Sequence, residues 1–332
     1  MRTAFITGLA GQDGVYLGRH LTGLGYRVLG TVTSLSDAHA TLATYLPGAT
    51  AFECDIRDSV ALGAILDQER PDEIYNLASW SSVGRSWSDP EQVTAVNGLA
   101  VLGLLEQVKK LRDRIGYDPR ICQASSSEMF GLVKELPQTE DSPHHPRSPY
   151  AVSKSFAHHT AVNYRESYGM FVATAILFNH ESPLRPTSFV TRKITAGAAA
   201  IAAGQQEVLS LGRLDVRRDW GAAGDYVQAM HAMLQHDEPD TFNVATGESH
   251  SLDDFLREAF VAAGIPDYES RVTSDPALLR PADVPETMGD AAKARAVLHW
   301  KPTQTFSEIV QRMVSADIRR LDTGIADDPA YL

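Results

Sequence analysis

A glycine-rich turn near the start of the chain constrains the fold more than any other feature. Glycines 8, 11 and 14 form the pattern GxxGxxG within Thr7–Gly14, between an apolar, β-rich run and a helical pattern. In such a turn the first glycine permits a tight bend, the second lets the backbone approach a pyrophosphate, and the third lets helix pack on strand. Because the helix N-terminus then faces the phosphates, the turn predicts a dinucleotide site rather than a turn without a ligand.

Short β-rich runs alternate with longer helical patterns through the first half of the chain. The expected strands are Thr3–Thr7, Arg27–Val32, Thr50–Cys54, Glu73–Leu77, Arg120–Ala124 and Phe171–Phe178. The expected helices are Gly14–Leu24, Asp58–Glu69, Glu91–Arg112 and Tyr150–Tyr168. Such alternation is typical of βαβ units. We therefore expect an α/β fold, a Rossmann-like doubly wound parallel sheet with a smaller C-terminal substrate-binding domain.

The pattern changes after about residue 180, where prolines break it into loops and short elements. Ser251-x-x-Asp254 resembles a capping box and predicts a helix start, a last helix is expected over Gln304–Leu321, and Phe242–Ala245 reads as one more strand that could rejoin the sheet. We expect two domains between which the chain is interleaved. The dinucleotide-binding domain takes 1–178, about 222–247 and part of 290–320, and the substrate domain takes about 179–221 and 248–332.

The charge balance limits the class of ligand. The chain has 30 Lys and Arg against 42 Asp and Glu, a formal net charge of −12, which argues against nucleic acid and anionic membranes. The N-terminal residues carry no signal-peptide pattern, no apolar stretch reaches the roughly 20 residues that span a bilayer, and Cys54 and Cys122 suggest no disulfide framework. We expect a cytoplasmic enzyme without a metal site.

A tyrosine and a lysine four residues apart, Tyr150 and Lys154, lie on one helical face. An ammonium group near a tyrosine favours the phenolate. Burial near Lys154 together with a nicotinamide cation could lower the pKa of Tyr150 from about 10 to near 7, which would make it a general base. Ser126, at the end of the fifth expected strand, can bind the same substrate oxygen. Together the three residues form the apparatus of short-chain dehydrogenases, which makes a chance pair on a surface helix the minority interpretation.

Glu128, two residues past Ser126, bears on the type of reaction. A simple dehydrogenase needs no carboxylate there, whereas a dehydratase needs one to remove the proton next to a transient ketone. The alternative is a capping or solvated glutamate.

The residues after the second and third expected strands leave the dinucleotide open. An acidic residue after the second strand typically binds the ribose 2′-hydroxyl of NAD, and an arginine the 2′-phosphate of NADP. Here Thr33 and Ser34 follow that strand, and either could hydrogen-bond either ribose. Asp55, with Ile56 after it, is expected to meet the adenine.

Several longer stretches resemble the GDP-mannose 4,6-dehydratase family of extended short-chain dehydrogenases. They are Thr7–Gly14, Asn76–Ala78, Gln123–Glu128, Arg147–Lys154, Asn163–Gly169, Leu177–Pro183, Phe189–Thr195, Arg218–Gly221, Arg280-Pro281 and Gly289-Asp290. The resemblance implies an intramolecular redox cycle. Tyr150, helped by Lys154 and Ser126, would take the C4-hydroxyl proton while hydride leaves C4, Glu128 would take the C5 proton as water leaves C6, and the hydride would return to C6.

The resemblance also assigns binding residues. Cofactor contacts, including those of the glycine-rich turn, fall on Gly8, Gly11, Gln12, Asp13, Gly14, Thr33, Ser34, Asp55, Ile56, Leu77, Ala78, Tyr150, Lys154, His180 and Arg185. Contacts to a GDP-sugar fall on Ser82, Asn179, Val190, Lys193, Arg213, Arg218, Arg280 and Asp283. Local charge agrees, because 185–218 carries six basic residues (Arg185, Arg192, Lys193, Arg213, Arg217 and Arg218) against the acidic Glu207 and Asp215.

The cofactor implied by the resemblance is NADP, tightly bound and recycled. The family's paired arginines after the second strand, which bind the 2′-phosphate and support a tetramer, are Thr33 and Ser34 here. NAD therefore stays an alternative. A homodimer through the 91–112 and 150–168 helices is implied, with a tetramer open.

Two further positions differ from the family, Ser82 for its histidine and Asp283 for its glutamate. A dehydratase or epimerase of another nucleotide sugar is therefore the alternative function. A non-catalytic nucleotide-binding relative has little reason to keep Ser126, Glu128, Tyr150 and Lys154 together.

Overall fold

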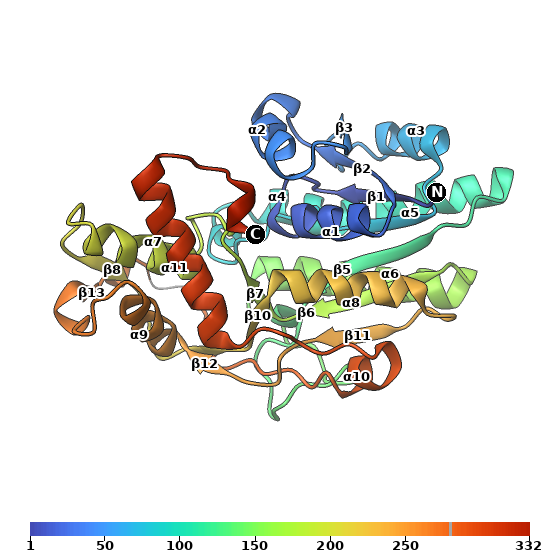
Figure 1. Ribbon diagram of the computed structural model, residues 1–332. Helices are drawn as coiled ribbons and strands as arrows, with labels where there is room; N and C mark the ends of the chain where they lie inside the picture. Colours follow the sequence, from blue (N-terminus) through green and yellow to red (C-terminus); the bar gives the residue numbers. More distant parts are fainter. Residues whose placement is uncertain (279–280) are drawn as a thin grey trace.

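A seven-stranded parallel sheet lies at the centre of the structure (Figure 1). The computed structural model describes residues 1–278 and 281–332. From edge to edge the strands are β3 (Thr50–Glu53), β2 (Arg27–Val32), β1 (Thr3–Thr7), β4 (Glu73–Asn76), β5 (Arg120–Ser126), β6 (Val172–Leu177) and β11 (Thr241–Val244). The strand order reverses between β1 and β4, as in doubly wound folds. The expected α/β class is confirmed, and so is the return of 242–245 to the sheet.

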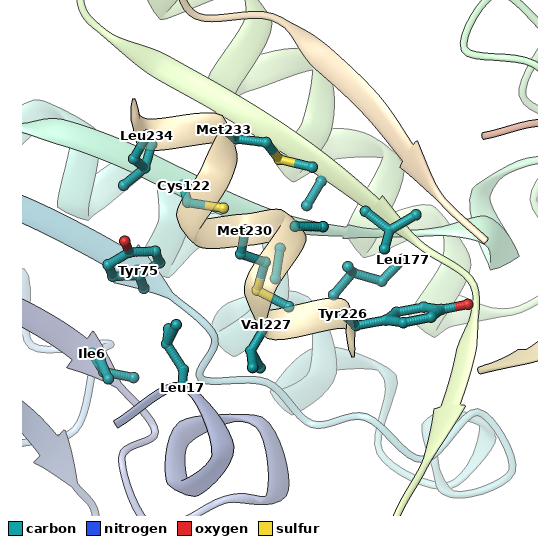
Figure 2. Packing of buried hydrophobic residues seen from close by; sticks show 14 of the residues in the cluster. Ile6, Leu17, Tyr75, Cys122, Leu177, Tyr226, Val227, Met230, Met233 and Leu234 are labelled. Carbon is teal, nitrogen blue, oxygen red and sulfur yellow. The ribbon is translucent and has the colours of Figure 1, made fainter. Parts of the chain in front are cut away.

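Helices cover both faces of this sheet, which explains why its strands are nearly continuous apolar runs. One face carries α1 (Gln12–Gly23), α8 (Ala223–Gln235) and α10 (Ala292–Leu298), and the other carries α3 (Ser59–Glu69), α5 (Ala100–Ile115) and α6 (Pro149–Tyr168). Figure 2 shows the inner side of α8, where Val227, Met230 and Leu234 lie over Tyr75 and Cys122 of the sheet. The buried side chains on the two faces hold the carboxyl ends of the strands in fixed positions.

Three further helices and two short strand pairs pack together beyond the carboxyl ends of the strands, and we name this group the C-terminal lobe. It consists of α7 (Val190–Ala202), α9 (Leu252–Ala262), α11 (Phe306–Thr323) and the strand pairs β8 (Leu209–Leu211) with β13 (Val272–Ser274) and β9 (Arg217–Arg218) with β12 (His250–Ser251). A separate apolar cluster holds these helices together, with Phe255, Phe260 and Met313 at its centre. How the chain divides into domains stays a prediction.

The lobe is connected to the sheet by a short parallel pair, β7 (Asn179–Glu181) and β10 (Trp220–Ala222). The chain leaves the sheet after β6, returns for α8 and β11, and passes out again toward α9 (Figure 1). Within the lobe, a buried ion pair joins α7 to α11. Arg192 Nη2 lies 2.6 Å from Asp317 Oδ1, and their side chains are 9% and 3% exposed.

The helix caps follow the sequence closely. The capping box Ser251–Asp254 is present at the start of α9, and an equivalent box of Thr305 and Glu308 begins α11. Each satisfies backbone N–H groups that the first helical turn leaves without a partner.

The expected helix over 91–112 is interrupted. α4 (Pro90–Thr94) and α5 are joined by a π-helical turn, Ala95–Leu99, at which Asn97 is buried. The Asn97 amide binds the Trp80 backbone, accepting from its N–H at 2.8 Å and donating to its carbonyl at 3.1 Å. This tertiary pairing fixes the irregular turn. A further helix, α2 (Leu35–Tyr45), was not expected.

Short single turns complete the described chain. They are Arg85–Trp87, Ser127–Met129, Glu269–Arg271, Pro276–Leu278 and Pro329–Tyr331. Among the described residues, no helix has the length and apolar character needed to cross a membrane. Cys54 and Cys122 are free and buried.

Candidate active site

A cavity of about 760 Å³ opens where the carboxyl ends of the central strands meet the C-terminal lobe. Its walls come from the turns after β1, β4, β5 and β6 and from the first residues of α7. This is the crevice outside the point where the strand order reverses, the usual ligand position in open α/β sheets.

The glycine-rich turn forms one end of this cavity. Gly8 has φ +74°, and a Cβ on Gly14 would lie 2.4 Å from the Gly8 carbonyl oxygen, so neither position has room for a side chain without rearrangement. Gly11 caps α1 without any side-chain hydrogen bond to the first turn. The free N–H groups of that turn therefore fit the pyrophosphate of a dinucleotide.

A histidine and an aspartate lie beside the turn. His180 Nδ1 lies 2.8 Å from the Phe178 carbonyl oxygen, and His180 Nε2 lies 2.9 Å from Asp13 Oδ2. Burial alone would raise the pKa of Asp13, but His180 and Arg185 hold it far below its usual value. The Asp13 carboxylate and the His180 ring therefore lie together at this end of the cavity.

The four expected catalytic residues come from two adjoining segments. Ser126 ends β5, Glu128 lies in the single turn that follows, and α6 carries Tyr150 in its first turn with Lys154 one turn later. Ser148 is the N-cap of α6, because its Oγ accepts a hydrogen bond from the Ala151 N–H at 3.1 Å. All four line the cavity.

Lys154 is buried beneath the tyrosine. Its Nζ donates to the Ala124 carbonyl at 3.0 Å and lies 5.9 Å from the centre of the Tyr150 ring. Burial lowers the pKa of Lys154 to about 8, against the weaker opposing effect of Asp13. The ammonium is therefore held by one carbonyl at the tyrosine's side, in an apolar surrounding that favours its loss of a proton.

The environment of Tyr150 favours its neutral form. Burial raises the pKa of Tyr150 to about 12, the Glu128 carboxylate adds to the rise, and the hydrogen bond with Ser126 and the charge of Arg185 oppose it. The expected pKa near 7 depends on a nicotinamide cation as well as on burial near Lys154, and it stays a prediction. Additional positive charge is needed for Tyr150 to act as a base.

Glu128 occupies the wall facing the tyrosine. Its side chain is 13% exposed, and its Oε1 lies 4.0 Å from Arg218 Nε. The guanidinium of Arg218 is itself fixed, donating to the Val284 carbonyl at 2.8 Å and to Asp283 Oδ1 at 3.0 Å. Glu128 and Tyr150 both line the cavity, and the Glu128 carboxylate contributes to the raised pKa of Tyr150.

A second helix N-terminus forms the far end of the cavity. α7 begins after Phe189 without a side-chain cap, and Val190 and Lys193 in its first turns line the cavity. Two uncapped helix starts, those of α1 and α7, thus open into one space, and each is a ready site for phosphate groups.

A family model described as GDP-mannose 4,6 dehydratase matches residues 5–313. This match covers nearly the whole chain. The chain belongs to the GDP-mannose 4,6-dehydratase family. GDP-mannose 4,6 dehydratase 2 of Arabidopsis thaliana is 43% identical over 326 residues, which covers 96% of this chain and 87% of the relative. GDP-mannose 4,6 dehydratase of Homo sapiens is 41% identical over 345 residues, covering 96% and 92%.

Solved structures agree with this family fold. RMD from Pseudomonas aeruginosa, complexed with NADPH, has a TM-score of 0.81 at 26% identity, covering 96% of this chain and 100% of its own. UDP-glucose 4-epimerase from Thermus thermophilus, complexed with NAD, also has a TM-score of 0.81 at 26% identity, covering 95% and 98%. Both the phosphorylated and the unphosphorylated dinucleotide thus occur on structures of this shape.

Most of the site residues expected for this dehydratase family surround the cavity. Those on the dinucleotide side are Gly8, Gly11, Gln12, Asp13, Gly14, Leu77, Ala78, Tyr150, Lys154, His180 and Arg185. Those on the substrate side are Ser82, Asn179, Val190, Lys193, Arg213, Arg218 and Asp283. Arg280 lies outside the described residues.

Other expected residues lie elsewhere. Thr33, Ser34, Asp55 and Ile56 follow β2 and β3 and do not line the cavity. Ser34 caps α2, since its Oγ accepts from the Asp37 N–H at 3.3 Å.

Fewer basic residues of 185–218 line the cavity than the sequence contains in that segment. Arg192 turns into the lobe toward Asp317, and Arg217 Nη2 donates to the Ser249 carbonyl at 2.5 Å, so neither lines the cavity. Their partners lie far along the chain, and no local pattern indicates them.

The sequence reasoning missed several members of the cavity wall. The loop after β4 contributes Arg85 and Trp87 in addition to Ser82, and Phe189 and Trp220 contribute aromatic surface from the lobe. The tryptophans of that loop were the available signal, because Trp80 and Trp87 are large apolar side chains in an otherwise polar segment. Arg85 Cζ lies 5.6 Å from the Trp80 ring centre, and this cation–π contact stabilises the loop.

Proposed function

We propose that this protein converts GDP-mannose to GDP-4-keto-6-deoxymannose, with a bound NAD or NADP that is regenerated in each turnover. One observation carries the proposal: Glu128 and Tyr150 line one cavity, and two uncapped helix N-termini open into it. The phenol suits removal of a hydroxyl proton, the carboxylate suits removal of a carbon-bound proton, and the helix starts suit two diphosphates.

Tyr150 takes the proton of the C4 hydroxyl, and Ser126 hydrogen-bonds the same oxygen. A nicotinamide held in this cavity would supply positive charge beside the phenol and the hydride exchange between C4 and C6. Lys154, held by the Ala124 carbonyl, keeps an ammonium next to the phenolate as it forms. Charge therefore develops on Tyr150 only where two cations surround it.

Glu128 removes the C5 proton, which the new C4 ketone has made acidic. The C5–H electron pair forms the C5–C6 double bond, the C6 hydroxyl leaves, and the carboxyl group of Glu128 gives it the proton that completes water. As the hydride returns to C6, C5 gains a proton, and the proton that Tyr150 took from the C4 hydroxyl accounts for it. Arg218 Nε lies 4.0 Å from the Glu128 carboxylate.

The GDP diphosphate is proposed to lie at the start of α7. Lys193, Val190, Arg213 and Arg218 all line the cavity. The remaining expected contacts, Asn179, Ser82 and Asp283, also line it and suit the hydroxyls of a sugar.

The family resemblance implies NADP, with NAD as the alternative. It also implies a homodimer. We propose a cytoplasmic location, because thiols such as those of Cys54 and Cys122 stay reduced there.

Substitution of the proposed base tests the function directly. Glu128→Gln should reduce formation of the 4-keto-6-deoxy product by about 10²–10⁴-fold, because the amide cannot take the C5 proton. Product is followed by mass spectrometry of the nucleotide sugar. The control is Glu135→Gln, an exposed glutamate in the same loop that should leave the rate unchanged. Elimination at the wild-type rate in Glu128→Gln would contradict the assignment.

A second substrate class is favoured by two positions of this chain. Ser82 replaces the family's histidine and Asp283 its glutamate, and both line the sugar part of the cavity. A panel of GDP-, UDP- and dTDP-sugars, analysed for loss of water and for epimerised product, separates the alternatives. Turnover of GDP-mannose below that of another sugar would favour the alternative substrate.

A further inference from the structure

The turn between β2 and α2 receives a carboxylate from the neighbouring strand. Glu53, the last residue of β3, pairs with Val32 at the end of β2. Its Oε2 accepts a hydrogen bond from the Leu35 N–H at 2.8 Å. An acidic group thus stands at the carboxyl end of β2, although the residues that follow β2 in the sequence, Thr33 and Ser34, are neutral.

This is the position at which doubly wound folds bind the adenosine ribose. The glycine-rich turn is tied to it, because Gly8 N and Leu9 N both donate to the Thr31 carbonyl, at 3.1 and 3.0 Å. A pyrophosphate on the first turn of α1 therefore has its adenosine side directed over the end of β2, where Glu53 lies.

The cations near this position are already engaged. Arg57 lies 3.0 Å from both oxygens of Asp55 through its Nε, and its Nη1 donates to Gln92 Oε1 at 2.5 Å. The side-chain hydrogen bond to Arg57 lowers the pKa of Asp55, which keeps that pair ionised. No described Lys or Arg side chain makes a hydrogen bond or ion pair with Glu53.

We propose that Glu53 makes this enzyme bind NAD in preference to NADP. One oxygen of the carboxylate is used by Leu35, and the other can accept a hydrogen bond from the ribose 2′-hydroxyl. A 2′-phosphate carries between one and two negative charges at neutral pH and meets the carboxylate as a like charge instead. This inference rests on the proposed function only in requiring that a dinucleotide binds.

The helix that follows the turn is held on its outer side. Thr41 Oγ1 donates to Asp327 Oδ2 at 3.0 Å, and the Asp328 N–H donates to the Tyr45 hydroxyl at 3.1 Å. These contacts hold α2, and the N–H of its first residue, Leu35, binds one oxygen of Glu53.

The test is a binding titration of the protein freed of its dinucleotide. Isothermal calorimetry with NAD⁺ and with NADP⁺ should give a Kd for NAD⁺ at least about tenfold lower, as expected for one like-charge contact near the surface. Glu53→Gln keeps an acceptor for the Leu35 N–H but removes the charge. It should improve NADP⁺ binding several-fold and reduce the preference.

Two further variants sharpen the result. Glu238→Gln removes an exposed carboxylate beyond α8, at the opposite end of the sheet, and should leave both Kd values unchanged. Thr33→Arg adds a guanidinium at an exposed position of the turn and, combined with Glu53→Gln, should reverse the preference toward NADP⁺.

The outcomes separate the two proposals. Two results would overturn the role of Glu53 and leave the dehydratase function standing. One is tighter binding of NADP⁺ than of NAD⁺ by the wild-type protein, and the other is a preference for NAD⁺ in Glu53→Gln that is as large as in the wild type. Binding of neither dinucleotide would instead contradict the proposed function itself. Mass analysis of the dinucleotide that co-purifies gives an independent reading.

Discussion

At the scale of single residues, two buried ionisable groups dominate the site. Desolvation favours the neutral form of both Tyr150 and Lys154, which raises the pKa of the phenol to about 12 and lowers that of the ammonium to about 8. The pair therefore becomes a base and its supporting cation only when substrate and dinucleotide fill the cavity.

The hydroxyl of Tyr150 is predicted to be indispensable for oxidation at C4. Tyr150→Phe should lower kcat by about 10²–10⁴-fold, because no other described group hydrogen-bonded to Ser126 can take the proton. Binding of the dinucleotide, measured by calorimetry, should change little. Full activity in this variant would contradict the oxidation step.

Lys154 is predicted to reduce stability at neutral pH. The pKa of its folded state, about 8, lies below the unfolded value of 10.5, so the folded chain binds the proton less tightly and stability should rise as the pH rises from 8 to 10.5. Lys154→Met should therefore raise the free energy of unfolding at pH 7 by about 1–3 kcal/mol while abolishing turnover.

Urea unfolding of the wild type and Lys154→Met at pH 7 and pH 10 checks this prediction. The gap between the two proteins should shrink at the higher pH, where the wild-type folded state has already lost the proton. A gap that stays constant with pH would show that packing, not the buried charge, causes the difference.

At the scale of elements, the first turn of α1 depends on its third glycine. Gly14→Ala should abolish or severely weaken dinucleotide binding, because the new Cβ would lie 2.4 Å from the Gly8 carbonyl and 2.6 Å from that of Leu9. Gly23→Ala, at the other end of the same helix and with nothing within 4 Å, is the matched control and should bind normally. Calorimetric titration of both variants makes the comparison.

Elements with strong local signals were predictable, and those set by distant contacts were not. Apolar runs in the sequence predict the buried strands, and the capping residues Ser251 and Asp254 predict the start of α9. α2 escaped notice because only Ala38 and Tyr45 of its residues are buried, which leaves no apolar periodicity. The π-helical turn was missed because the Asn97 contacts that fix it reach a different loop.

The same distinction applies to the site. The glycine turn and Tyr150 with Lys154 are short patterns with fixed spacing, and the structure brings them together as expected. Glu53 was overlooked, because its place at the ribose position arises from pairing of β2 with β3 and not from its sequence distance to the glycines. Sequence-adjacent Ser34 was favoured instead, although its hydroxyl serves as a helix cap.

At the scale of the whole molecule, the Arg192–Asp317 pair holds the C-terminal lobe together. Asp317→Asn should lower the free energy of unfolding by about 3 kcal/mol, since it leaves the Arg192 guanidinium buried without a counter-charge. Asp113→Asn, in a largely exposed pair with Lys109, should cause no measurable change. Urea denaturation of the two variants decides between a structural and a negligible role.

An exposed apolar surface on α6 and the adjoining π-helical turn is predicted to form the homodimer contact. Leu99, Val152 and Phe156 are 56%, 54% and 43% exposed. Phe156→Glu should shift the protein to monomers in light scattering, because it places a charge in that contact. Val60→Glu, at an isolated exposed position on α3, should not. A monomeric wild type would rule out this interface.

The interleaved path of the chain limits how such an enzyme can acquire a new sugar. The residues proposed for the sugar nucleotide come from β7, α7, the segments around β9, the loop after β4 and the segment after β13. Between β9 and α9 in the sequence, α8 packs on the sheet and β11 joins it. No single cut separates specificity from chemistry, so recombination of whole gene segments would disrupt both. Diversification of this architecture is therefore expected to proceed by point substitution in the cavity wall.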